Sequence, residues 1–140
     1  MAETINFHFD IDGGNFTSAG EASVRIKKLL RDMNFPSDII RRVSVAMYEG
    51  EINMVIHANG GSADVNVTPD KIDIILADKG PGIDNIELAM QEGYSTAPDN
   101  IRSLGFGAGM GLPNMKRYTD EMKIESEVGR GTTIYMTVKV

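Results

Sequence analysis

A carboxylate and a carboxamide stand four positions apart in the segment YEGEINMVIH, at Glu49 and Asn53. In a helix this spacing brings both side chains to one face, one turn apart. A carboxylate there can act as a general base, and an amide oxygen is a suitable ligand for a hard cation. The same pair also suits a plain solvated helix face, so on its own it leaves both interpretations open.

A second group of chemically useful residues follows an apolar run, in the segment DKGPGI at 78–83. Asp78 ends a stretch that we expect to be a central, buried strand, and a buried carboxylate requires hydrogen-bond partners. It could accept a hydrogen bond from an exocyclic amine of a bound base, while Gly80 and Gly82 would let the base approach the backbone closely. A surface turn is the simpler alternative.

Two glycine-containing segments complete the set. The segment GFGAGMGLPNM precedes an expected short helix, where successive backbone N–H groups suit a phosphate. Its glycines are Gly105, Gly107, Gly109 and Gly111. Their spacing matches neither the dinucleotide-binding fingerprint nor the Walker A loop. The segment GRGTT places Thr132 and Thr133 after an expected hairpin turn. A flexible loop and an ordinary turn are the alternatives for these two segments.

The elements that must position these residues follow from hydrophobic periodicity. Alternation or apolar runs predict strands at 5–11, 63–68, 71–77, 121–126 and 132–140. Helical spacing predicts helices at 21–33, from 37 to a closing Asn59-Gly60-Gly61, and at 112–120, with a short helical piece at 85–93. Ser18 and Glu21 have the spacing of a capping box at the start of the first helix. The segment 93–111 has little periodicity, which is typical of a functional or disordered loop.

This order of elements predicts an α+β fold, a two-layer α/β sandwich whose mixed, mostly antiparallel sheet carries helices on one face. The 140 residues are expected to form a single domain spanning 1–140. A net charge of −6 with scattered basic residues disfavours a nucleic-acid partner. No apolar run is long enough for a membrane helix, no signal-peptide pattern is evident and there is no cysteine, so we expect a cytoplasmic protein.

Taken in order, these segments resemble the motifs of the GHKL (Bergerat-fold) ATPase superfamily, from about residue 45 to the C-terminus. YEGEINMVIH resembles the N box, DKGPGI the G1 box, GFGAGMGLPNM the G2 box and GRGTT the G3 element. Within the superfamily, EGYST and GAGMGLPNMKRYTDEMKIES are most similar to the small bacterial anti-sigma-factor and switch-protein serine kinases. The RsbT-like branch is nearest, and RsbW and SpoIIAB are more distant.

The resemblance implies the Bergerat ATP-binding fold, with ATP and Mg²⁺ as cofactors. Glu49 would act as the base on the attacking hydroxyl, Asn53 would ligate Mg²⁺, and Asp78 would bind the adenine amino group. Thr132 or Thr133 would assist Asp78 through water, and Gly80 and Gly82 would frame the base. The phosphate-binding turn and the hinge of an ATP lid would be formed by Gly105, Gly107, Gly109, Gly111 and Leu112.

The activity that the resemblance implies is that of a protein serine/threonine kinase in a bacterial partner-switching system. Its substrate would be a STAS-type anti-sigma-factor antagonist, a sigma factor is a further expected partner, and relatives suggest a homodimer. Two alternatives remain open. One is an anti-sigma or partner-sequestering module that binds ATP without turnover, and the other is a slow ATPase that uses water as the acceptor.

Two positions depart from the pattern of these kinases, Gly50 and Glu51. Alanine is usual at the first, and glycine inside a helix costs about 1 kcal/mol relative to alanine. A small or apolar residue is common at the second, so Glu51 is expected to change the charge balance near the metal. The segment APDNIRS also makes the expected lid longer than in the RsbT-like pattern.

Overall fold

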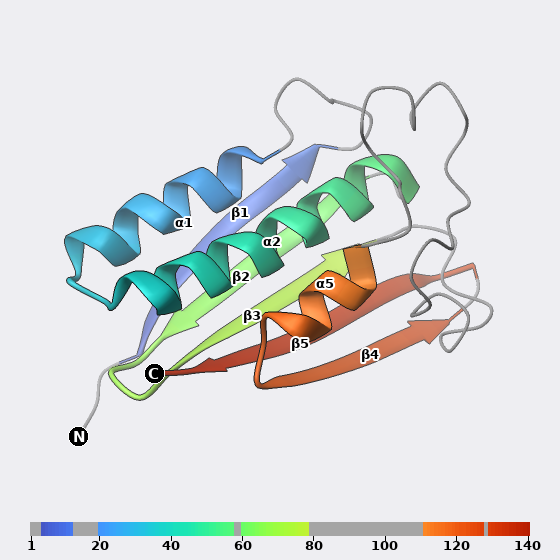
Figure 1. The fold of residues 1–140 in the computed structure, drawn as a ribbon. Coiled ribbons are helices and arrows are strands. Elements are labelled where there is room, and N and C mark those ends of the chain that lie inside the picture. Colours follow the sequence, from blue (N-terminus) through green and yellow to red (C-terminus); the bar gives the residue numbers. More distant parts are fainter. Residues whose placement is uncertain (1–3, 13–19, 58–59, 79–110, 128) are drawn as a thin grey trace.

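The computed structural model describes residues 4–12, 20–57, 60–78, 111–127 and 129–140. Figure 1 shows the chain with its elements labelled. In chain order they are β1 (Ile5–Asp12), α1 (Glu21–Asp32), α2 (Ser37–His57), β2 (Gly60–Val67), β3 (Lys71–Asp78), α5 (Gly111–Arg117), β4 (Glu121–Glu127) and β5 (Gly131–Lys139). All five predicted strands and three of the predicted helices are confirmed. The helical piece expected at 85–93 lies outside the described residues.

The strands form one sheet in the order β1-β2-β3-β5-β4, and each neighbouring pair is antiparallel. The sheet expected to be mixed is therefore wholly antiparallel within the described residues. β3 lies in the middle of the order, so Asp78 does end a central strand. Gly61 of β2 is the register partner of Asp78, and Thr133 of β5 is the partner of Ala77.

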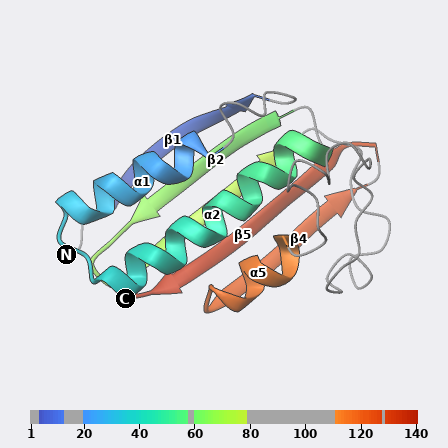
Figure 2. The same cartoon turned by 45° about the horizontal axis from the view of Figure 1, so that its top comes forward.

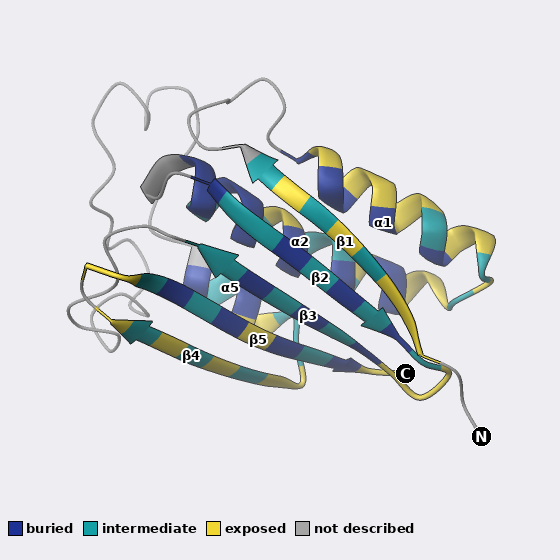
Figure 3. Cartoon of the chain, turned by 180° about the vertical axis from the view of Figure 1, so that it is seen from behind, coloured by how far each residue is buried: buried dark blue, intermediate teal, exposed yellow. Residues whose placement is uncertain are grey.

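The three described helices cover one face of the sheet, which confirms the predicted two-layer sandwich. Figure 2 shows α1 above β1 and β2, α2 along the middle, and α5 on the side of β4 and β5. The core lies between the layers and includes Ile26, Val43, Val65, Ile74 and Met115, each 0% exposed. Figure 3 shows the other face, where no described helix covers the strands. None of the described helices is both long and apolar enough to cross a membrane.

Two helix ends differ from the sequence prediction. α1 begins at Glu21, after Gly20 in a left-handed conformation (φ 97°), so Glu21 is the first helical residue and not the last member of a capping box that starts at Ser18. No side chain at Gly20 can cap the helix, and a distant carboxylate does so instead, as shown below. Gly60 and Gly61 do not close α2, because both pair with β1 as the first residues of β2.

Candidate functional site

Asn53 on α2 and Asp78 on β3 lie toward the C-terminal ends of their elements. Figure 1 shows that the C-terminal end of α2, the end of β3, and the starts of α5 and β5 are all at the same end of the molecule. A Cβ added to Gly50 would lie 2.0 Å from Cδ1 of Leu76, so α2 packs directly against β3 here. Asn53 lies about 4.5 Å beyond Gly50 along the helix axis, and Asp78 about 7 Å beyond Leu76 along the strand. Both are therefore displaced from this contact toward the same end.

The surroundings of Gly50 leave little room for the alanine that is usual at this position. Beside the clash with Leu76, its added Cβ would lie 3.6 Å from Sδ of Met115, and both neighbours are buried. Glycine lowers the intrinsic stability of the helix, and its lack of a side chain lets α2 pack closely on the sheet and α5. An alanine at this position would require the end of the buried Leu76 side chain to move.

Asp78 is half-buried, where a fully buried carboxylate was expected, and its carboxylate is held from β5. The backbone N–H of Thr132 donates to Oδ1 of Asp78 at 3.1 Å. The Thr132 side chain is 6% exposed, and its hydroxyl lies 2.8 Å from Oγ of Ser126 on β4. One carboxylate and two hydroxyls therefore occupy neighbouring positions on the helix-facing side of three adjacent strands.

Strand alternation separates the two threonines of the GRGTT segment. Thr132 is buried with Ile134 and Met136 on the helix-facing side of β5. Successive side chains of a strand point to opposite faces, so Thr133 points to the uncovered face. Of the two threonines, Thr132 is the one on the same side as Asp78.

Gly61 fixes how closely β2 approaches the end of β3. A Cβ at this position would lie 2.1 Å from the carbonyl oxygen of Ala77 and 2.8 Å from Cα of Asp78. These are backbone atoms, which cannot rotate away as the end of a side chain can. Glycine therefore permits the close strand approach that sets the backbone position of Asp78. The sequence pattern had indicated a different role for this glycine, as part of a helix end.

Glu49 is contacted by α5. Nδ2 of Asn114 donates to Oε1 of Glu49 at 3.1 Å, and both residues are partly buried. Nη1 of Arg117, one turn further along α5, donates to Oδ1 of Asn114 at 3.3 Å. Sequence reasoning assigned Glu49 but missed Asn114, because a single asparagine within a glycine-rich motif carries no signal of its own.

Glu51 lies on a different side of α2 from Glu49 and Asn53, because residues two apart are rotated by about 200° around a helix. Its carboxylate is 2% exposed and accepts the backbone N–H groups of Gly20, Ala22 and Ser23, at 2.9, 3.3 and 2.6 Å. Burial raises the pKa of Glu51 above its ordinary value, although these hydrogen bonds act in the opposite direction. The expectation that this carboxylate alters the charge near a metal is therefore wrong, since it caps α1.

Most of the predicted glycines lie outside the described residues, namely Gly80, Gly82, Gly105, Gly107 and Gly109. Gly111 begins α5. Leu112 is 6% exposed and belongs to the hydrophobic core, so a contact between this residue and a nucleotide would have to come from its backbone.

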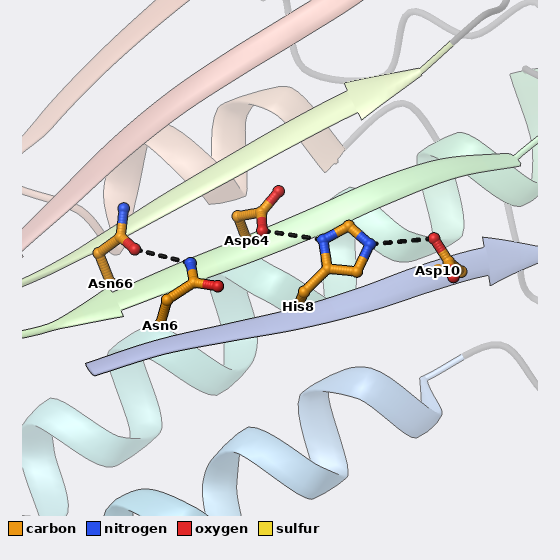
Figure 4. A network of polar contacts seen from close by, with 5 residues as sticks. All are labelled: Asn6, His8, Asp10, Asp64 and Asn66. Carbon is orange, nitrogen blue, oxygen red and sulfur yellow. Dashed lines mark hydrogen bonds and ion pairs between the residues drawn. The ribbon is translucent and has the colours of Figure 1, made fainter.

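A separate polar network lies on the uncovered face of β1 and β2 (Figure 4). Nδ1 of His8 is 2.8 Å from Asp64 and Nε2 is 3.1 Å from Asp10, while Asn6 donates to Asn66 at 2.8 Å. The hydrogen bond with Asp64, followed by that with Asp10, raises the pKa of His8 above its ordinary value. Within the described part of the chain, no three or more His, Asp or Glu side chains are grouped so that they could hold a metal ion.

The fold and these motifs define a nucleotide-using domain of the histidine kinase type. Residues 15–138 match the family described as "Histidine kinase-like ATPase domain", and the chain belongs to this family. The predicted membership of the GHKL superfamily is thereby confirmed, and so is the use of a nucleotide at the level of the family.

The named relatives of the chain indicate which branch of this family it resembles. The anti-sigma F factor of Clostridium beijerinckii is 32% identical over 124 residues, which cover 84% of this chain and 83% of that protein. The anti-sigma F factor of Clostridium acetobutylicum is 35% identical over 123 residues, covering 84% and 82%. The serine/threonine-protein kinase RsbT of Bacillus subtilis is 30% identical over 112 residues, covering 77% and 78%. These relatives agree with the predicted anti-sigma and switch-kinase branch.

A solved structure supports the fold independently. The mycobacterial sensor histidine kinase MprB matches with a TM-score of 0.54 and 18% sequence identity, covering 96% of this chain and 97% of that one. At this identity the likeness concerns the arrangement of helices and strands alone.

Proposed function

We propose that the chain is an ATP-dependent protein serine/threonine kinase of a bacterial partner-switching system, acting in the cytoplasm on a STAS-type anti-sigma-factor antagonist. The observation that carries the proposal is that α2, which bears Glu49 and Asn53, packs on β3, which Asp78 ends, and that the C-terminal ends of both elements lie at the same end of the molecule. Relatives named as anti-sigma F factors and as a serine/threonine-protein kinase support it.

Asp78 is proposed to bind the amino group of adenine. An ionised carboxylate is an acceptor only, and the N–H of Thr132 holds it in one orientation. The adjoining hydroxyls of Thr132 and Ser126 can hold a water molecule toward the ring edge. This donor and acceptor set fits the amino edge of a purine, and Gly80 and Gly82 keep their proposed role beside the base.

Asn53 is proposed to supply one oxygen ligand to Mg²⁺. This cation is usually held by few protein groups, together with phosphate oxygens and water, so one amide oxygen fits an ion that enters with a triphosphate. When bound, Mg²⁺ supplies charge neutralisation at the phosphates. The phosphates themselves are assigned to Gly105, Gly107, Gly109 and Gly111, as the motif resemblance implies.

Glu49 is proposed to orient and deprotonate the serine hydroxyl of the partner. The serine oxygen forms a bond to the γ-phosphorus, the bond to the β-phosphate oxygen breaks, ADP leaves, and the hydroxyl proton passes to the carboxylate. Such transfers depend mainly on positioning and charge neutralisation. The four-residue spacing keeps the base and the proposed metal ligand on one face of α2, one turn apart.

A second candidate function is sequestration of a sigma factor without phosphoryl transfer. The two relatives named as anti-sigma F factors, at 32% and 35% identity, favour it. In this alternative nucleotide binding prepares the surface that holds the partner. A homodimer remains part of both proposals.

One experiment separates the candidates. The purified chain is incubated with γ-labelled ATP, Mg²⁺ and candidate STAS-domain proteins from the same cell. Label on a partner serine supports the kinase, and release of free phosphate without labelled partner supports a slow ATPase. Nucleotide binding with neither product would overturn the kinase and leave the sequestering module.

Replacement of Asp78 by asparagine tests the nucleotide site. Asp78→Asn puts a donor where the adenine amino group also donates, so the affinity for ATP should fall roughly 10- to 100-fold, as expected for loss of a charge-assisted hydrogen bond. Calorimetric titration measures this directly. Asp73→Asn is the matched control, since Asp73 lies on the same strand but bonds Thr137 instead. Equal affinities of Asp78→Asn and the unaltered chain would rule out the proposed role.

A further inference from the structure

We infer that Asn114 is a positioning residue for the proposed base: it holds Glu49 in the orientation that accepts the proton of the attacking serine. The inference rests on the proposed function and adds to it a residue that the motif resemblance does not assign. It also links the base to α5, the helix that begins at the last glycine of the phosphate-binding segment.

The geometry is a chain of three side chains from two helices. Arg117 donates to Oδ1 of Asn114 at 3.3 Å, and Nδ2 of Asn114 donates to Oε1 of Glu49 at 3.1 Å. A carboxylate can only accept and a guanidinium can only donate, so the two ends of the chain allow a single orientation of the amide between them. Asn114 is thereby oriented from one side by Arg117 and orients Glu49 on the other.

The neutral amide has a specific advantage over a direct ion pair. A guanidinium bonded to the carboxylate would favour its charged form and make it a weaker base. An amide donates one hydrogen bond without adding a positive charge at the carboxylate. It fixes Oε1 and leaves Oε2 as the oxygen directed to the serine hydroxyl.

The support for Asn114 is rigid. Its neighbour Met115 is 0% exposed and Leu112 is 6% exposed, so two residues of α5 are anchored in the core. Sδ of Met115 lies against Gly50, the residue next to Glu49. A side chain between two anchored helices loses little freedom when it bonds the base, which is the requirement for preorganisation.

The test compares phosphoryl transfer by Asn114→Ala, Asn114→Asp, Asn114→Gln and Arg117→Ala. At saturating ATP and partner, we expect kcat to fall roughly 10- to 30-fold for Asn114→Ala, with KM for ATP changed less than about twofold. Asn114→Gln keeps the amide and should retain more activity than Asn114→Ala. Arg117→Ala should reduce kcat roughly two- to fivefold, because it removes the hydrogen bond that orients the Asn114 amide and leaves the bond between Asn114 and Glu49 in place.

Asn114→Asp tests the pH dependence of the rate, which would stay unchanged if Asn114 had a purely structural role. Its carboxylate faces Glu49, and like-charge repulsion should shift the acidic limb of the pH–rate profile to higher pH. Lys116→Ala is the control, since Lys116 is exposed on the same helix. Circular dichroism establishes the folded fraction of each variant, and if Asn114→Ala does not fold, Arg117→Ala and the pH profile of Asn114→Asp decide.

The outcomes distinguish this inference from the proposed function. If the unaltered chain transfers phosphate and the Asn114 variants keep its kcat and pH profile, the inference is overturned and the kinase stands. If the unaltered chain transfers none to any STAS partner, the proposed function fails, and the inference fails with it. Loss of kcat with an unchanged KM and a shifted acidic limb supports both.

Discussion

Glu49 and Glu51 are carboxylates two residues apart on α2, and the structure gives them opposite surroundings. Glu51 is 2% exposed and accepts three backbone N–H groups, whereas Glu49 is half-buried and accepts one side-chain amide. Among the described residues, both oxygens of Glu51 are bonded by backbone N–H groups, whereas only Oε1 of Glu49 is bonded. Residues two apart on a helix point to different sides, so Glu51 can cap α1 while Glu49 faces α5, where it is proposed to act as the base.

The structural role of Glu51 follows from the ends of α1. The first turn of a helix leaves backbone N–H groups without partners inside the helix. Gly20 has no side chain to supply one, and Glu51 satisfies the N–H groups of Gly20, Ala22 and Ser23 from α2. The helix that carries the candidate site is thus fastened to α1 by the residue next to Gly50. We therefore expect replacement of Glu49 to lower the rate of phosphoryl transfer, and replacement of Glu51 to lower the free energy of unfolding.

The largest effect is expected from Glu49→Gln on phosphoryl transfer. Removal of a general base lowers the rate by roughly 10²- to 10⁴-fold, while a half-buried polar position should change the free energy of unfolding by no more than about 0.5 kcal/mol. Labelled transfer to the STAS partner and urea denaturation measure the two quantities. Undiminished transfer by Glu49→Gln would exclude Glu49 as the base. A large loss of stability in this variant would show that Glu49, like Glu51, stabilises the fold.

The converse variant, Glu51→Gln, should act on stability. Its amide cannot accept three N–H groups with both terminal atoms, and its NH₂ would face a backbone donor. We expect a loss of about 2 kcal/mol in the free energy of unfolding at neutral pH. Urea denaturation checks this against Glu121→Gln, a control at an exposed position of β4. A change as small as that of the control would mean that Glu51 contributes little to the start of α1.

Local patterns were enough to predict much of the fold. Alternation located the strands, and helical spacing located α1, α2 and α5, because each element exposes one face to the same core. The motif spacing also selected Glu49, Asn53 and Asp78, whose elements the fold brings to one end of the sheet. These features are periodic or clustered in the chain, so a single sequence is sufficient to detect them.

The missed features all depend on contacts between distant segments. The cap of α1 comes from Glu51, 28 to 31 residues away, while the sequence offered Ser18 as a local substitute. Gly61 was assigned to a helix end because its need for close approach to β3 appears only once the strands are paired. Asn114 and Ser126 are single polar residues whose value depends on their neighbours across helices and strands.

The smallest expected effect concerns pH and tests why Glu51 differs from Glu49. Burial raises the folded-state pKa of Glu51 above the ordinary value of 4.5, so between these two pKa values the folded chain binds more protons than the unfolded chain. The stability that Glu51 contributes is then full below about pH 4.5 and declines as pH rises through the folded-state pKa. The decline amounts to about 1.4 kcal/mol for each pH unit that separates the folded-state pKa from the unfolded-state pKa.

The difference in unfolding free energy between the unaltered chain and Glu51→Gln isolates this residue, because His8 and the other titrating groups are common to both. Urea denaturation from about pH 4.5 to about pH 8 should show this difference falling and then levelling. A difference that grows with pH would mean that the three backbone N–H groups outweigh burial, and that Glu51 is held chiefly as a charged helix cap.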